Sequence, residues 1–455
     1  MNPHLRLISR AVLLIMLMIL FVGCGSSGGT EESTGAEAPT ESERPAESEK
    51  VSEEPVVLKF MFWGGPEAPG DWEPIMEKFR ANGHENVTFE IIHQPQDYET
   101  KLQTLIAGNE TPDVVLFNDA MVAGYAEEGL LLDQVPYYEA MGVDPQEMYV
   151  EAALRYVGDE LSCVGTGLHT MIMYYNKAVF DAAGVEYPPH EQEDAWTWDE
   201  FVDVARQLSG GEGMERTYGA YLPPWPTIWR VFVESNGGKF YNDDLNSVAL
   251  DSPEAVEVIQ NLADLRLVEQ VAPPVDMIDS LGWDIFLQND RAAMFIDGTF
   301  VMSFLMEWWG DDLGLAVLPK YDEYVTHPIV DCPVVFNNTE HPQEAFEFAQ
   351  FLTDPSHWMD DYRAGLSTPV VKEYLFGDKA SEWLDSPTLP DNYASVVVNN
   401  LNYTGTNPGF LTSKHALVEW PVIMPHIYEV LQGEATAQEA MAAAKVEADE
   451  VLQEQ

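Results

Sequence analysis

The chain has 455 residues, of which 77 are Asp or Glu and 22 are Lys or Arg, and its formal net charge is −55. Such an excess of negative charge repels nucleic acids and anionic lipid headgroups, so it argues against a nucleic-acid partner and against direct binding to an acidic membrane surface. Hydrophobic residues make up 46% of the sequence, and this length is sufficient for two or three domains with a large buried core.

The first residues have the pattern of a bacterial export signal. Arg6 and Arg10 precede an apolar run over residues 11–22, which is short for a bilayer span. The next motif, Phe21-Val-Gly-Cys24, is similar to a bacterial lipobox, in which the Cys is lipid-modified after cleavage on its N-terminal side. We expect residues 1–23 to be a lipoprotein signal peptide and Cys24 to carry the lipid; the alternative is an uncleaved membrane anchor.

The segment after Cys24 is polar and acidic. Residues 25–55 consist mainly of Gly, Ser, Thr, Glu, Ala and Pro and contain no aromatic residue. Such a composition cannot bury enough apolar surface to offset the entropy lost on ordering. We therefore expect residues 24–55 to be a disordered tether, which holds a folded body at the outer face of a cell membrane through the lipid anchor alone.

The folded body begins with a β-α-β-α-β pattern. Apolar residues at positions 58, 60 and 62 predict a strand that ends at Trp63, and the Gly-Gly-Pro that follows favours a sharp turn. Asp71 is the expected N-cap of the first helix. A strand over 87–92, a helix from Asp97 to Gly108 and a buried strand over 111–117 follow. This order predicts an α/β fold with a mostly parallel sheet and helices on both faces.

Ligands of open α/β sheets bind beyond the carboxyl ends of the strands. Trp63 follows the first strand, and Asn118 and Asp119 follow the third, so the sequence places all three on one rim. The indole of Trp63 is then free to stack on a ligand; the alternative is that it caps the sheet as a core residue.

The rest of the chain continues with alternating strands and helices. The expected elements are a strand over 169–175, a helix capped by Thr197 and Glu200, a helix opened by Ser252-Pro253, a strand over 291–296, extended segments over 316–319 and 328–336, a helix over 342–352, and a last helix capped by Thr436 and Glu439.

Short motifs recur in a recognisable order along this body. They are the opening strand with Trp63, Tyr98-Glu-Thr-Lys-Leu102, Thr111-Pro-Asp113, Glu128-Gly-Leu-Leu-Leu-Asp133, Met173-Tyr-Tyr-Asn-Lys177, Trp196-Thr-Trp-Asp-Glu200, Asn236-Gly-Gly238, Ala292-Ala-Met-Phe-Ile-Asp-Gly298, Val317-Leu-Pro319 and Glu344-Ala-Phe-Glu-Phe348. Each is weak alone. Their order over nearly all of residues 56–455 resembles the extracellular solute-binding proteins of ABC importers, in the group that includes maltose-binding protein.

The resemblance implies two α/β lobes joined by a hinge, with a ligand trapped between them. It assigns residues 56–162 and 333–380 to lobe I and residues 163–332 and 381–455 to lobe II. The chain crossings would then lie near residues 161–164 and 330–334, in neighbouring hinge strands. Cys163 and Cys332 lie in these crossings, so a disulfide between them is a hypothesis that needs Cα atoms within about 7 Å; the alternative is two small buried residues.

The sequence departs from the family pattern at two places. The family often has Trp where this chain has Phe300, and the Gly-Gly that commonly follows the Leu-Pro segment is replaced around Val330-Asp-Cys332. These departures bear on the identity of the ligand more than on the fold.

Aromatic residues after Gly or Pro turns are the candidates for stacking on a ligand. The resemblance implies this role for Trp420, thirteen residues before Gly433, and a packing role is the alternative for every candidate. The aromatic set is Trp63, Trp225, Trp229, Phe300 and Trp420, with Trp283 a weaker choice. The polar set expected at the rim is Asn118, Asp119, Asp297, Asp331 and Arg363, with Gln94 and His169 as lower choices.

These residue types suit a sugar. Flat rings match the C–H faces of a sugar, and Asp, Asn and Gln side chains pair with its hydroxyls. Phosphate and sulfate ligands are usually bound by Lys and Arg side chains, which are scarce in this sequence. The runner-up is a polyamine or another cationic ligand, held by acids and aromatic rings.

Other classes of function remain as alternatives. A cell-surface glycosidase needs two carboxylates at a fixed separation, which acidic pairs alone do not establish, and a glycan adhesin would bind without closing its lobes. The sequence has no nucleophile elbow, no His-Glu-x-x-His motif and no phosphate loop. We therefore expect a monomeric, non-enzymatic receptor for a mono- or oligosaccharide that needs no metal or cofactor and, as the resemblance implies, delivers its ligand to a membrane permease.

Overall fold

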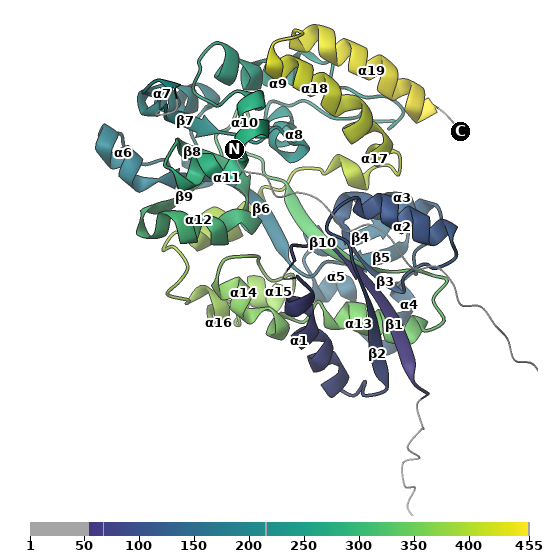
Figure 1. Ribbon diagram of the computed structural model, residues 1–455. Coiled ribbons are helices and arrows are strands. Elements are labelled where there is room, and N and C mark those ends of the chain that lie inside the picture. The colour runs from purple at the N-terminus through teal and green to yellow at the C-terminus, as the bar shows by residue number, and fades with distance from the viewer. Residues whose placement is uncertain (1–53, 67, 214–215, 454–455) are drawn as a thin grey trace, which may run out of the picture. The chain divides into compact units, whose positions relative to one another are not determined.

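The computed structural model describes residues 54–66, 68–213 and 216–453. The predicted signal peptide over residues 1–23, Cys24 and the tether up to residue 53 lie outside these residues. Within the described residues, no helix combines the length and the apolar character needed to cross a membrane. Residues from Glu53 onward form one compact unit, and its elements are labelled in Figure 1.

The opening pattern folds as the sequence predicts. Its elements are β1 (Val56–Phe62), α1 (Ala68–Ala81), β2 (Val87–His93), α2 (Tyr98–Ala107) and β3 (Val114–Asn118). Strand β1 pairs in parallel with both β2 and β3, which confirms the parallel pairing predicted for these three strands. The prediction of a mostly parallel sheet is wrong, because the sheet as a whole is mixed, with antiparallel pairs elsewhere. The predicted N-cap of α1 is wrong. The helix begins at Ala68, whose N–H donates to the carbonyl of Gly65, and Asp71 lies within the first turn.

Further helices and a small hairpin complete this part of the sheet. The elements are α3 (Asp119–Glu127), α4 (Val135–Met141), α5 (Pro145–Met148), β4 (Leu154–Val157), β5 (Glu160–Val164), α13 (Pro342–Phe351), α14 (Met359–Arg363), α15 (Lys372–Leu375) and α16 (Ser381–Leu384). Helices α1 and α13 pack a dense aromatic cluster onto β1. The Phe348 ring lies 5.2 Å from both Phe60 and Phe79, and all three side chains are fully buried.

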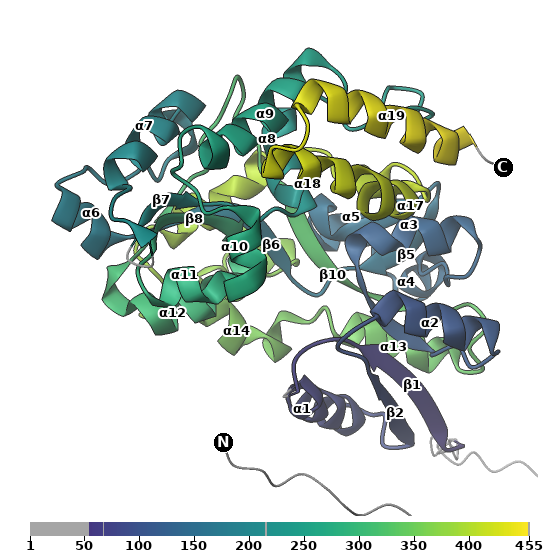
Figure 2. The same cartoon turned by 45° about the horizontal axis from the view of Figure 1, so that its top comes forward.

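A second strand group lies around β6. Its elements are β6 (Leu168–Asn176), α6 (Lys177–Ala183), α7 (Trp198–Leu208), β7 (Tyr218–Tyr221), α8 (Pro226–Ser235), α9 (Pro253–Leu267), α10 (Val275–Leu281), α11 (Trp283–Gln288), β8 (Ala292–Gly298), α12 (Met302–Trp309) and β9 (Leu313–Ala316). The C-terminal helices α17 (His415–Val418), α18 (Met424–Gln432) and α19 (Ala437–Gln453) also belong to this group. The capping box at Thr197 and Glu200 is confirmed. Figure 2 shows α18 and α19 lying side by side, where they pack on α9.

Strand β10 (Pro328–Val335) joins the two strand groups. Its residues 331–335 pair antiparallel with β3, and its residues 328–330 pair antiparallel with β6. The strand order is therefore β2-β1-β3-β10-β6-β8-β7, with β9 also paired to β6. The result is the two-lobed α/β fold, with β10 shared by both halves. The residue limits assigned to each lobe remain a prediction.

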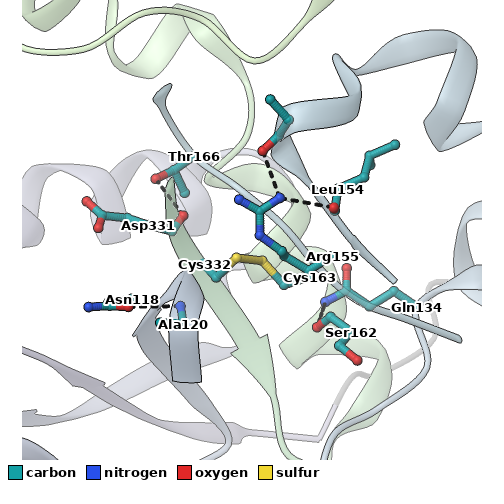
Figure 3. Close-up of a disulfide and its surroundings, with 11 residues drawn as sticks. Asn118, Ala120, Gln134, Leu154, Arg155, Ser162, Cys163, Thr166, Asp331 and Cys332 are labelled. Carbon is teal, nitrogen blue, oxygen red and sulfur yellow. Dashed lines mark hydrogen bonds between the residues drawn. A yellow bond between two sulfur atoms is a disulfide. The ribbon is translucent and has the colours of Figure 1, made fainter. Parts of the chain in front are cut away.

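A disulfide lies at this junction (Figure 3). It joins Cys163 of β5 to Cys332 of β10, with 5.8 Å between the Cα atoms. Both cysteines are fully buried. The neighbouring Arg155 donates from Nη1 to the carbonyls of Ala152 and Leu154 at 2.7 and 3.1 Å. The bond therefore fixes the β4–β5 hairpin to the strand that both halves of the sheet share.

We predict that removing this disulfide destabilises the protein strongly. The bond closes a loop with a sequence separation of 169 residues, and a loop of that length corresponds to about 3–5 kcal/mol in the free energy of unfolding. The Cys163→Ser, Cys332→Ser double variant should show this loss in urea unfolding. Reductant should lower the stability of the wild type towards that of the variant and should leave the variant unchanged. Two free thiols in the intact mass of oxidised wild type would contradict the prediction.

Candidate ligand-binding cleft

A hollow of about 610 Å³ lies where β3, β10 and the segment leading into β6 meet. One wall is the first part of α1, with Trp72 and Lys78, and another is the segment 357–367. The base includes Thr166, His169 and Asp331. Asp331 and His169 are the residues of the predicted ligand set that line this hollow. Among the residues whose side chains the structure describes, the lining does not include the other predicted residues, Trp63, Asn118, Trp225, Trp229, Asp297, Phe300, Arg363 and Trp420.

Trp63 stands just beyond the carboxyl end of β1. Its side chain is half-buried, and its ring packs edge-on against Tyr98 at 5.2 Å. The Tyr98 hydroxyl lies 3.0 Å from the carbonyl of Met61 and 2.9 Å from that of Leu116, which ties the ends of β1 and β3 together. Gly64 follows with a φ of +123°, where a Cβ would lie 2.6 Å from the side chain of Ala68. Only glycine fits this turn, which sets the direction of the Trp63 backbone.

Asn118 and Asp331 face each other across the β3–β10 pair. The Asn118 side chain is exposed, but its Oδ1 accepts from the N–H of Ala120 at 2.9 Å and so caps α3. The carbonyl of Asp331 accepts from the N–H of Thr166 at 3.0 Å. It also accepts from the Thr166 hydroxyl at 3.4 Å, which is the bond drawn in Figure 3. Asp119 is the first residue of α3, and its side chain is not described.

The end of β8 brings three candidate residues together on the other side. The Phe300 ring lies over Gly298, where a Cβ would come within 2.2 Å of the ring. Phe300 contacts His169 edge-on at 5.7 Å and lies 6.1 Å from the ring of Trp225. Burial lowers the pKa of His169 to about 4, against a backbone hydrogen bond with Leu366 that raises it. His169 is therefore neutral at neutral pH, so its ring is able both to donate and to accept.

Asp297 lies beneath this surface and not at the rim where the sequence placed it. Its side chain is only 6% exposed, and its Oδ1 accepts from the N–H of Gly298 at 2.7 Å. Burial raises the pKa of this carboxyl to about 7, although the bond from Gly298 lowers it. The burial of both faces of β8 explains the difference, because residues 292–298 are all buried and neither face is open to solvent.

Trp229 is also buried, whereas the prolines around it had suggested a stiff surface loop. It is 2% exposed, its Nε1 donates to the sulfur of Met424 at 3.5 Å, and its ring stacks on Phe240. The prolines before it do not form a projecting loop, because Pro226 is the first residue of α8. Nearly every residue of α8 is buried, and Trp229 is not among the residues that line the hollow at β3 and β10. Trp229, Arg230, Val233 and Glu234 instead line a second hollow of about 250 Å³.

Trp420 is 57% exposed and lies in the π-helical turn Glu419–Ile423. The turn is held from below by Glu419, which pairs with Arg230 of α8 at 3.1 Å and with His415 at 3.3 Å. Burial alone would raise the pKa of Glu419, but Arg230 and His415 together hold it below the usual value. A buried ion pair thus holds the residue that directly precedes Trp420.

Arg363 lies apart from the cleft lining. It is the last residue of α14, and its Nε and Nη2 donate to the carbonyl of Glu382 at 3.0 and 2.8 Å. Its side chain is thereby turned towards α16, and it is absent from the residues that line the hollow.

Two tryptophans that the sequence did not indicate as ligand residues line the hollow. Trp72 and Trp358 meet edge-on at 5.7 Å, and the Trp358 Nε1 donates to the carbonyl of Leu352 at 2.7 Å. Trp72 has the spacing of a core-facing helical residue, and Trp358 lies in an irregular turn, so no local pattern in the sequence marks either one. Long-range packing alone brings them to the cleft.

The lining of the hollow is acidic. It includes Asp71, Asp331, Asp360 and Asp361, with Lys78 among them. The pKa of Asp361 is raised by burial, and Asp360 and Asp71 reinforce the shift. Among the residues that the structure describes, no three His, Cys, Asp or Glu side chains converge to hold a metal ion.

The family model for the bacterial extracellular solute-binding protein matches residues 64–357. This chain belongs to that family. The resemblance noted in the sequence is therefore confirmed, and the cleft of this solute-binding protein lies within the matched region apart from residues 358–367.

Two curated relatives have sugar ligands in their names. The arabinooligosaccharide-binding protein of Halalkalibacterium halodurans is 29% identical over 185 residues, which is 39% of this chain and 38% of the relative. The maltotriose-binding protein of Pyrococcus abyssi is 23% identical over 292 residues, which is 63% of this chain and 60% of the relative. The chain thus spans less than two thirds of the length of either relative.

Solved structures of similar proteins share the fold of this solute-binding protein. An ABC substrate-binding protein of Listeria monocytogenes in complex with cycloalternan has a TM-score of 0.78 at 22% identity, over 88% of this chain and 100% of that one. A maltose-bound protein of T. maritima has a TM-score of 0.71 at 19% identity, over 87% of this chain and 100% of that one. The predicted two-lobed α/β fold is confirmed.

We predict that Asp297→Asn stabilises the protein at alkaline pH but not at acidic pH. The folded-state pKa of about 7 lies above the ordinary value of 3.8, so the folded wild type binds more protons and loses stability as the pH rises through that window. Asn keeps the acceptor for Gly298 and cannot ionise. The variant should match the wild type near pH 4 and exceed it by on the order of 2–4 kcal/mol at pH 8. Urea unfolding at both pH values measures this, and a pH-independent difference would show that Asp297 ionises normally.

Proposed function

We propose that the protein is the substrate-binding lipoprotein of an ABC importer and captures a mono- or oligosaccharide between its lobes. The observation that carries this is a hollow lined by aromatic rings and polar groups, among them Trp72, Trp358, His169 and Asp331. Phe300 and His169 lie on the β6–β8 side, and Trp63, Asn118 and Asp331 lie at the β1–β3–β10 edge. The names of the two curated relatives, which specify oligosaccharides, support the same ligand class.

The chemistry of these groups suits an uncharged, hydroxyl-rich ligand. The ring of Phe300 offers a flat face for sugar C–H groups. The amide of Asn118, the carboxylate of Asp331 and the neutral imidazole of His169 offer donors and acceptors for hydroxyls. A sugar that lacks one of these hydroxyls would leave a polar group unpaired, which is a source of specificity. The acidic wall around Asp361 disfavours phosphorylated ligands.

Binding works by shifting the balance between open and closed lobes. A ligand that contacts both sides gains its full set of contacts only when the lobes close, so it favours the closed form by its differential affinity. The closed form then docks on a membrane permease. In this proposal the chain acts without catalysis, as a monomer, at the outer face of the cell membrane, and the lipid on Cys24 is its only membrane contact.

A cationic ligand is the second candidate, because acids and two tryptophans share one wall of the cleft. Trp72 and Trp358 lie among Asp71, Asp331 and Asp361, and aromatic faces with carboxylates bind amines. The relatives with sugar in their names make this the weaker candidate.

The first test is thermal unfolding of residues 53–455 with sugars, polyamines and amino acids. A ligand at 100 times its dissociation constant adds about 2.7 kcal/mol to the free energy of unfolding, so its binding raises the unfolding midpoint. We expect a rise with oligosaccharides, and the bound sugar should be recovered unchanged by chromatography. A rise with polyamines alone would replace the proposal with the second candidate, and hydrolysis of the sugar would favour a glycosidase.

We predict that Trp63→Ala and Trp420→Ala each weaken sugar binding by about 1–3 kcal/mol without unfolding the protein. Both rings are partly or largely exposed, so their removal leaves no cavity in the core. Calorimetric titration measures the loss. Phe376→Ala is the matched control, since Phe376 is 56% exposed and lies just after α15, outside the cleft lining. Wild-type affinity in both tryptophan variants would contradict the assignment of these rings to the cleft.

A further inference from the structure

Residues 404–411 form a strap that contacts both strand groups. At one end of the strap, Gly405 lies so close to α8 that a Cβ there would stand 2.3 Å from Oε2 of Glu234. At the other end, Gly409 lies against α3, where a Cβ would stand 2.9 Å from the Cβ of Ala120. Only glycine permits either approach without a shift of the neighbouring atoms. The strap therefore touches α8 of one strand group and α3 of the other.

The contact with α3 continues after the strap. The 3-10 turn Pro408–Phe410 within the strap and helix α17 beyond it both pack on α3, and Figures 1 and 2 show α17 beside that helix. Helix α3 begins at Asp119 and is capped by Asn118. These are two of the residues that the sequence places at the rim of the ligand site, so the strap lies at the end of α3 that is nearest to that rim.

Polar groups of α8 hold the strap in this position. The N–H of Thr406 donates to the carboxylate of Glu234, at 3.0 Å from Oε1 and 3.1 Å from Oε2. Arg230 donates from Nη1 to Oδ1 of Asn407 at 3.3 Å, and the same oxygen accepts from the N–H of Gly409 at 3.0 Å. Hydrogen bonds with an ionised partner are about twice as strong as those between neutral groups.

His327 fixes the carboxylate of Glu234 from another side. Its Nε2 lies 2.6 Å from Oε2 of Glu234, and the residue is buried. Burial alone would raise the pKa of Glu234, but His327 and the N–H of Thr406 help to hold it below the usual value. Burial lowers the pKa of His327. The pair is thus a carboxylate that accepts from a neutral imidazole, which keeps Glu234 charged and turned towards the strap.

Open space adjoins the strap. Thr406, Pro408 and Leu411 line the second hollow of about 250 Å³ together with α8. A further hollow of about 460 Å³ lies between α3 and residues 413–417, which directly follow the strap in the chain. These spaces interrupt the packing around the strap, so its position depends strongly on the polar bonds to α8.

We infer that the strap couples the two lobes and that Glu234 is the positioning residue that holds it against α3. The inference rests on the proposed function in one respect, because such coupling matters for a ligand that is trapped by closing lobes. Glu234 is not among the residues that line the hollow proposed for the ligand, so it acts through the strap. Loss of its carboxylate frees the strap and shifts the balance towards open lobes.

The test is hydrogen exchange in the protein without ligand. Glu234→Ala removes the acceptor for Thr406, so exchange should rise about tenfold or more over residues 404–411. It should also rise over α3, because the strap covers the end of that helix. Glu234→Gln keeps an acceptor oxygen for Thr406, and its NH2 can donate to the other tautomer of His327. This variant should stay within about threefold of the wild type.

Asp449→Ala is the matched control. Asp449 of α19 likewise accepts a backbone N–H, from Val248 at 2.8 Å, and pairs with Lys445 at 2.8 Å. It holds residues 247–248 and not the strap. Exchange should therefore rise around residue 248 in this variant and stay unchanged over α3. Strand β1 is the internal reference for global stability, and its exchange should be the same in all variants.

Four results would overturn the inference. A rise confined to residues 404–411 in Glu234→Ala would make the strap a loop of one lobe. No rise at all would show that Glu234 does not hold it. An equal rise over α3 in Asp449→Ala, or a rise that extends to β1 in Glu234→Ala, would mark a general loss of stability in place of lobe coupling.

A binding measurement separates the inference from the proposed function. With a sugar found by thermal unfolding, Glu234→Ala should raise the dissociation constant about three- to tenfold through faster dissociation, and Glu234→Gln should bind as the wild type does. Unchanged affinity in Glu234→Ala would overturn the inference and leave the proposed function standing. Failure of every sugar to bind the wild type would overturn the proposed function, whereas a rise in exchange over α3 would still support the coupling.

Discussion

The pairing of strand β10 with two different partners is the constraint on which the two-lobed structure depends. Residues 331–335 are held by β3 and residues 328–330 by β6, so the change of partner falls between Val330 and Asp331. The backbone on either side is locked in a ladder. A change in the angle between the lobes must therefore be absorbed by few residues, at this point and in the segment 165–167 between β5 and β6. The disulfide between Cys163 and Cys332 lies beside that point and limits sliding of the β4–β5 hairpin against β10.

Features set by local sequence could be predicted, because their causes lie within a few residues. The parallel order of β1, β2 and β3 follows from alternating apolar residues and short helices. The Thr197–Glu200 capping box follows from two side chains three residues apart. The start of α1 could not be predicted in the same way. The helix already begins at Ala68, whose N–H donates to the carbonyl of Gly65, so Asp71 lies inside the first turn although its side chain is a better N-cap.

Features set by long-range packing could not be predicted from local pattern. Trp229 is buried because it packs against Phe240 and Met424, which are distant in the sequence, and nothing within residues 223–229 reveals this. Asp297 is buried because both faces of β8 are covered. Trp358 reaches the cleft from an irregular turn. The cysteines are 169 residues apart, and only the resemblance to a known family placed them in neighbouring strands. For the same reason, the sequence predicted the types of residue that suit a ligand, but it predicted less well which individual residues of each type face the cleft.

The exposed rings share a design in which each is held by buried structure. Phe300 rests on Gly298, where no side chain is tolerated. Phe304 rests on Trp283 and through it on Phe295. Trp420 follows Glu419, which is fixed by Arg230 and His415 below the surface. A buried ion pair contributes little net stability, because desolvation offsets its attraction, so positioning explains the Arg230–Glu419 pair better than stability does. Rings that are held in place before binding lose little conformational entropy when a ligand covers them. The molecule can therefore leave aromatic surface open to solvent and still bind an uncharged ligand through shallow contacts.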